Sequence, residues 1–175
     1  MRVRRARNRG TVERHSEALA LLELPGDFVL VQRGVPRLLV MVCPDGCGDI
    51  VPVNLDERAS KAWKLYQRAG RTTLYPSVWR DEGCEAHFVL WNDIVHWSGI
   101  DDKESQSSAD LSAVFGRLHS DTFRTAFQIA LDLDEIPWAV TQACEELVRL
   151  HKAEEGTGKM RHYYRRNCDG TEATS

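Results

Sequence analysis

The sequence predicts an α+β protein in which a small antiparallel β domain is followed by an α domain of the winged helix-turn-helix type. Two observations lead to this prediction. Residues 25–98 contain short segments rich in Val, Ile, Leu and aromatic residues, bounded by Gly, Pro, Asp or Asn. After residue 108 the hydrophobic period changes to that of helices, and a basic segment that alternates like a hairpin follows.

Residues 1–24 are predicted to form a basic N-terminal arm and a short helix. Arginine occupies five of the first nine positions, which suits either contact with phosphates or a solvated, frayed terminus. Thr11–Leu24 has the pattern of an amphipathic helix with Thr11 as its N-cap, and the following Pro-Gly ends it.

Residues 25–98 are predicted to form the β domain. A two-residue turn at Asn92-Asp93 joins its last two strands as a hairpin. The predicted strands are Phe28–Gln32, Leu38–Val42, Ile50–Asn54, Ala62–Tyr66, Thr72–Tyr75, His87–Trp91 and Ile94–Trp97.

A polar segment over 99–108 is predicted to be a linker, and residues 109–168 the winged-helix-like domain. Ser108 and Ser120 are expected to cap the first two helices. The predicted helices are Ala109–Leu118, Asp121–Leu131 and Trp138–His151, and a basic, aromatic hairpin follows them as the wing. Residues 169–175 are predicted to be a disordered tail.

The composition excludes several classes of protein. Of 175 residues, 42% are hydrophobic and 28% are charged, which excludes a largely disordered chain, a collagen-like chain and a coiled coil. No apolar run approaches the roughly 18 residues that span a bilayer, and none is a signal-peptide core. The five cysteines are an odd number, which fits a reducing compartment. We therefore expect a cytoplasmic protein without membrane partners.

Three of the cysteines have the spacing of metal ligands. Cys43 and Cys47 flank a Pro/Gly turn, and two residues separate Cys84 from His87. Together they form a Cys₃His set of the kind that zinc prefers, so the sequence predicts a structural zinc ion that stabilises the β domain. Asp45 or water is the alternative fourth ligand if His87 points elsewhere. The thiols could also simply line a turn.

The segments CPDGCGDIVPVNLD (43–56), KAWKLY (61–66) and TLYPSVWRDEGCEAHFVLWNDIVHW (73–97) resemble the BubE family. The resemblance covers about residues 27–98. It rests on a Cys-Gly knuckle, a W-[KR]-L strand, an L-[YD]-P-S segment and a C-x-S-H-[FY] motif. The family is associated with bacterial ubiquitination-like operons. The resemblance implies a serine-type peptidase that acts on the C-terminal tail of a ubiquitin-like protein, with operon-encoded E1-like and E2-like proteins as further partners.

One position departs from the family motif. Ala86 occupies the place of the motif serine, and alanine cannot form an acyl-enzyme. If position 86 is the nucleophile, this chain is expected to be inactive. It is then either an inactive paralogue or a chain whose serine was replaced, and the otherwise intact motif favours replacement.

The other catalytic candidates are His87 and Ser77. His87 is expected to be a metal ligand, a general base or a core histidine, and the first two roles exclude each other. Ser77 is a second hydroxyl candidate, with a turn serine after Pro76 as the alternative. The tryptophans Trp63, Trp79, Trp91 and Trp97 are expected to lie in the core, with a platform for the substrate as the alternative.

The second half of the chain is acidic overall, with 9 basic and 14 acidic residues over 101–175. Its third helix offers few cations for phosphates, so protein contact or intramolecular scaffolding is expected in preference to nucleic acid. The sequence thus leaves two functions open. One is a serine-type peptidase, and the other is a zinc-binding adaptor that binds protein or nucleic acid through its winged helix.

Overall fold

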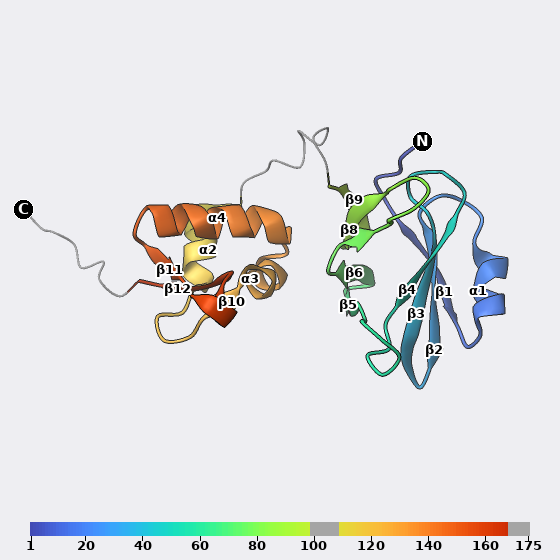
Figure 1. The fold of residues 1–175 in the computed structure, drawn as a ribbon, viewed down its shortest axis with the longest axis horizontal. Helices are drawn as coiled ribbons and strands as arrows, with labels where there is room; N and C mark the ends of the chain where they lie inside the picture. Colours follow the sequence, from blue (N-terminus) through green and yellow to red (C-terminus); the bar gives the residue numbers. More distant parts are fainter. Residues whose placement is uncertain (99–108, 168–175) are drawn as a thin grey trace, which may run out of the picture. The chain divides into compact units, whose positions relative to one another are not determined.

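The computed structural model describes residues 1–98 and 109–167 (Figure 1). It is a mixed α+β structure that divides into two compact units, Met1–Asp102 and Lys103–Ser175. The predicted linker over 99–108 and the predicted tail over 169–175, together with Cys168, lie outside the described residues. The predicted mixture of helices and sheets is confirmed.

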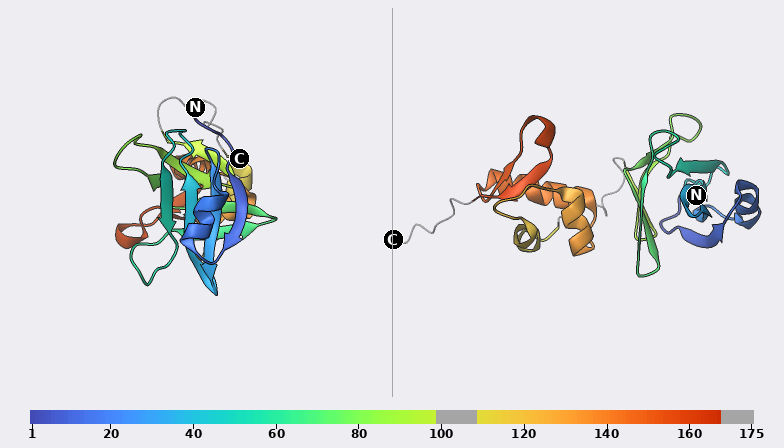
Figure 2. Two further views of the ribbon diagram at one scale, coloured as in Figure 1. Left: turned by 90° about the vertical axis from the view of Figure 1, so that its right-hand side faces the viewer. Right: turned by 90° about the horizontal axis from the view of Figure 1, so that it is seen from below.

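A four-stranded sheet in the order β1-β2-β3-β4 forms one part of the first unit. Helix α1, His15–Leu21, lies against β1, β2 and β3 (Figures 1 and 2). The strands are β1, Arg7–Val12; β2, Asp27–Arg33; β3, Val35–Val42; and β4, Ile50–Asn54.

Within residues 25–98 all strand pairs are antiparallel, as predicted. The prediction for residues 1–24 is wrong at β1, because residues 7–12 form a strand that pairs with β2 in parallel. Parallel neighbours need a crossover connection, and α1 is part of that connection. The helix therefore begins later than predicted, at His15 with Arg14 as its N-cap, because Thr11 belongs to β1.

The N-terminal arm is not frayed. Arg2 Nε lies 3.0 Å from Asp45 Oδ2, and the Val3 N–H donates to Pro44 O over 2.8 Å. Val95 N–H donates to Arg4 O over 2.8 Å. The arm thus lies between the turn that contains Pro44 and Asp45 and the strand that contains Val95.

Five further strands in the described part of the first unit form a hairpin and a three-stranded sheet of order β7-β8-β9. Asn92 and Asp93 both have positive φ, 51° and 63°, as the turn of a tight hairpin requires. The strands are β5, Lys64–Arg68; β6, Arg71–Tyr75; β7, Val78–Trp79; β8, His87–Trp91; and β9, Ile94–Trp97.

One apolar core joins these sheets. Phe28, Leu39 and Leu74 come from three strands and Phe88 and Leu90 from β8, and each is at most 1% exposed. Burial of this surface is the main favourable contribution to folding of the unit. Because β8 contributes to this core, the loops at its ends are held against a rigid base.

In its described residues, 109–167, the second unit has three α-helices and a small sheet of order β10-β12-β11. Asp110 caps α2, whereas Ser108 was predicted; Ser108 lies outside the described residues. Thr125 caps α3 in place of the predicted Ser120. The elements are α2, Leu111–Arg117; β10, Arg124–Thr125; α3, Ala126–Leu133; α4, Pro137–Arg149; β11, Ala153–Glu155; a 3₁₀ turn, Gly158–Met160; and β12, Tyr163–Arg166. None of the helices in the described ranges is long and apolar enough to cross a membrane.

Candidate functional site

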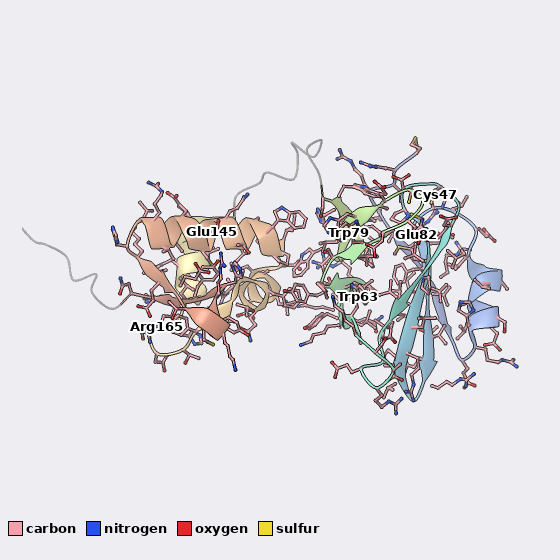
Figure 3. All side chains as sticks on the ribbon, in the orientation of Figure 1. Cys47, Trp63, Trp79, Glu82, Glu145 and Arg165 are labelled. Atoms are coloured by element: carbon pink, nitrogen blue, oxygen red, sulfur yellow. The ribbon has the colours of Figure 1, made fainter. Side chains whose placement is uncertain are left out.

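Three cysteines from two loops meet in the first unit. Cys43 directly follows β3, Cys47 lies in the loop that leads to β4 (Figure 3), and Cys84 lies between β7 and β8. Their sulfur atoms all lie within 4.8 Å of one another, and Cys43 Sγ is 3.6 Å from Cys84 Sγ. Sulfurs held about 2.3 Å from a tetrahedral zinc ion lie about 3.8 Å apart. The three thiols therefore fit a metal ion of this kind.

The turn after β3 brings Cys47 back to Cys43. The Cys43 N–H donates to Asp49 O over 2.8 Å, and the Gly46 N–H donates to Cys43 O over 3.1 Å. Gly46 has a φ of +88°, and a Cβ there would lie 2.7 Å from the backbone nitrogen of Met1. Only glycine adopts this positive φ without strain and, having no Cβ, leaves room for the Met1 backbone.

Arg80 supplies positive charge beside the sulfurs. Its Nη1 lies 3.2 Å from Cys84 Sγ and 3.4 Å from Cys47 Sγ, while Nη2 lies 2.8 Å from Asp49 Oδ2. The Arg80 guanidinium lowers the pKa of the Asp49 carboxyl. The arginine thus bridges the cysteine cluster and a carboxylate.

The thiols differ in acidity. Burial raises the pKa of the Cys43 thiol to about 12. Burial acts in the same direction on Cys84, but the Ala86 N–H, the two other thiols and the Arg80 charge outweigh it and lower the Cys84 pKa. An anionic sulfur is thus favoured at the partly exposed cysteine beside the arginine, where a metal cation would also stabilise it.

His87 is hydrogen-bonded to Ser77, ten residues earlier in the chain. His87 Nε2 lies 3.0 Å from Ser77 Oγ, and both side chains are half-buried. Trp79 and His87 are paired across β7 and β8, and side chains two residues apart on a strand share a face. Ser77 therefore lies on the same face as His87. Within the described ranges, the group of close metal-ligating side chains contains the three cysteines and not His87.

Ala86 lies on the opposite face. It is 1% exposed and packs in the core with Val78 and Phe88. Its carbonyl accepts the Arg80 N–H over 3.0 Å, so the antiparallel register of β7 and β8 continues through this residue. The structure thus brings together Ser77 and His87, and separately the three cysteines, but it leaves Ala86 buried beneath them.

Sequence reasoning missed three residues that surround these groups. Arg80 contacts the thiols, the Trp63 Nε1–H donates to Ser77 O over 3.1 Å, and Trp79 lies beside His87 with ring centroids 5.8 Å apart. The expectation that Trp79 lies in the core is wrong, since it is 66% exposed. A tryptophan on a two-residue strand has no periodicity that would indicate which way it faces.

The family model described as bacterial ubiquitination-like system serine protease (BubE) matches residues 12–98. No curated protein and no solved structure matches the chain. The matched segment runs from the end of β1 through β9 and includes the cysteine cluster, Ser77 and His87. Through residues 12–98, the chain is a member of the BubE family of bacterial ubiquitination-like system serine proteases.

Proposed function

We propose that the first unit is a serine-type peptidase in which Ser77 is the nucleophile and His87 the general base. The observation that carries the proposal is the 3.0 Å separation between Ser77 Oγ and His87 Nε2. A nucleophile and its base need to lie about 2.6–3.2 Å apart. No carboxylate of the described residues is bonded to His87, so the two side chains act as a dyad.

The dyad can carry out both halves of an acyl transfer. The Ser77 hydroxyl gives its proton to His87 Nε2 as its oxygen bonds to the substrate carbonyl carbon. The proton then passes to the leaving amine as the C–N bond breaks, which leaves an ester on Ser77. Water attacks this ester, His87 takes a proton from the water, and the proton returns to Ser77 Oγ.

On this proposal the chain is active as it stands, although position 86 is alanine. The expected inactivity depended on position 86 being the nucleophile. Burial argues against that role, because a serine placed 1% exposed among Val78 and Phe88 could not reach a substrate. Ser77 offers a hydroxyl on the face that His87 shares.

We further propose that Cys43, Cys47 and Cys84 hold a zinc ion with a structural role. The donor set and the 3.6 Å sulfur separation support zinc, and water is the simplest fourth ligand because His87 is engaged by Ser77. A bound zinc would link the β3–β4 turn to the segment just before His87. The base would thereby be positioned, since a misplacement of about 1 Å can cost on the order of 100-fold in rate.

The substrate that we propose is the C-terminal tail of a ubiquitin-like protein. The family description names a ubiquitination-like system, which supports a substrate of this class and E1-like and E2-like proteins as partners. A soluble cytoplasmic location is part of the same proposal.

For the second unit we propose a winged helix that contacts protein. Three helices followed by the β11–β12 hairpin, with β10 paired to β12, support this architecture. Two cations of the hairpin are engaged within the unit, since Arg165 is paired with Glu154 and the Arg166 guanidinium lies 4.4 Å from the centroid of the Phe115 ring. These engagements favour a protein partner over nucleic acid.

The test is cleavage of a ubiquitin-like protein fused through its C-terminus to a reporter. We expect the chain to cleave the fusion, and Ser77→Ala or His87→Gln to lower kcat by at least about 1,000-fold. Ser16→Ala on α1 is the matched control and should cleave normally. Binding without cleavage would favour the adaptor function instead, and a salt-dependent shift of duplex DNA would indicate nucleic acid as its partner.

A further inference from the structure

The three-stranded sheet ends at β7, directly beside Ser77. The order of strands is β7-β8-β9, so in the described residues one side of β7 has no neighbouring strand in its sheet. The Arg80 N–H donates to Ala86 O, and Trp79 is paired with His87 one step further along. Hydrogen-bonded and non-hydrogen-bonded pairs alternate in an antiparallel ladder. The Trp79 N–H and C=O therefore point away from β8, to the outer edge.

Two tryptophans flank this edge, and Figure 3 labels both. The Trp79 side chain is 66% exposed and stands on the face of the dyad, 5.8 Å from the His87 ring between centroids. Two residues before Trp79, the Ser77 carbonyl also faces outward, but it already accepts a hydrogen bond from Trp63 Nε1–H over 3.1 Å. An added strand can thus pair with Trp79 but not with the Ser77 carbonyl.

We propose that the outer edge of β7 binds the substrate peptide as an added β-strand. This inference rests on the proposed function and names how the same site holds its substrate. The Trp79 N–H and C=O form hydrogen bonds with the main chain of one substrate residue, and the Trp79 indole packs against the side chain of that residue. Residues 77 and 79 lie about 6.6 Å apart along a strand at about 3.3 Å per residue, so the scissile carbonyl lies about two residues from the paired one.

This mode of binding restricts which residue the substrate can have at the paired position. The paired residue must supply both an N–H and a C=O in an extended conformation, so proline is excluded there but tolerated where the ladder makes no bond. The ladder ends where Trp63 takes the Ser77 carbonyl. From that point the substrate backbone is free to turn its carbonyl carbon toward Ser77 Oγ.

The experiment measures binding to the full-length Ser77→Ala protein, with the ubiquitin-like fusion that the active chain cleaves as the probe. A single proline is moved along the last six residues before the cleavage point. We expect one position, about two residues before that point, to weaken binding by about tenfold, with neighbouring prolines having less effect. Trp79→Ala should weaken binding by about 30-fold and Trp79→Phe by less, as at interface hot spots.

Leu19→Ala is the control, because Leu19 is an exposed apolar residue on α1. It should bind normally, and all variants should keep the melting temperature of Ser77→Ala because both substituted side chains are exposed. A dissociation constant within twofold for Trp79→Ala, or a proline scan without a sensitive position, would overturn the β7 edge as the binding site. Neither result would affect the Ser77–His87 dyad, which fails only if Ser77→Ala still cleaves the fusion or if the unsubstituted chain does not.

Discussion

Replacing Ala86 by serine separates the two candidate nucleophiles. The added hydroxyl would lie at a position that is 1% exposed, within the core that contains Val78 and Phe88. The nearest backbone groups are already bonded, since Ala86 O accepts the Arg80 N–H and the Ala86 N–H interacts with Cys84. A buried hydroxyl without a partner costs about 1–3 kcal/mol of folding free energy. We therefore expect Ala86→Ser to be destabilised and to gain no activity.

The assay is urea unfolding combined with cleavage of the ubiquitin-like fusion. A loss of about 2 kcal/mol should lower the urea midpoint by on the order of 1 M. Ala6→Ser is the matched control, because Ala6 is 3% exposed in the same core, and it should show a similar loss of stability. An Ala86→Ser protein that is as stable as the parent and cleaves at least tenfold faster would refute the assignment of Ser77 as the nucleophile.

Three further predictions concern the cysteines and their surroundings. Cys43→Ser should lose the bound zinc and lower the melting temperature, as measured by metal analysis and calorimetry; an unchanged zinc content would contradict the three-cysteine site. Arg80→Met should weaken zinc binding by about 10–100-fold in a chelator competition, with Arg80→Lys intermediate, because Arg80 contacts two of the sulfurs; equal affinities would show that its charge has no effect on the metal. Burial raises the pKa of the Cys144 thiol to about 12, so at pH 8 iodoacetamide should modify Cys144 only on unfolding, as peptide mapping would show. The stability linked to Cys144 should be complete below the unfolded thiol pKa of about 8.5 and decline as the pH rises toward 12; rapid modification of the folded protein would contradict this.

Local sequence signals predicted much of the first unit. The bounds of β4, β8 and β9 agree with the predicted strands, because each is a short apolar run closed by Gly, Pro, Asn or Asp. The positive φ angles of Asn92 and Asp93 bear out the predicted hairpin turn. The proximity of Cys43 and Cys47 was predicted because they share one tight turn, and that of Cys84 because it had the spacing of a metal ligand with His87.

Features that depend on distant pairing were not predicted. β1 has an arginine-rich sequence, and its parallel partner β2 begins fifteen residues after β1 ends, so the pattern of residues 7–12 alone did not indicate a strand. Ser77 and His87 are ten residues apart and meet only because β7 pairs with β8. The motif C-x-S-H-[FY] predicted a nucleophile at position 86, but alternation along the strand turns residue 86 into the core and residue 87 out of it.

Covalent labelling of Ser77 tests the central claim most directly. A fluorophosphonate reacts with a serine hydroxyl that a base has activated, whatever the natural substrate is. Mass mapping of the treated full-length protein should find the adduct on Ser77, and His87→Gln should abolish it while Ser16 stays unmodified. An unlabelled Ser77 in the folded protein, or a labelling rate that His87→Gln leaves unchanged, would contradict the account.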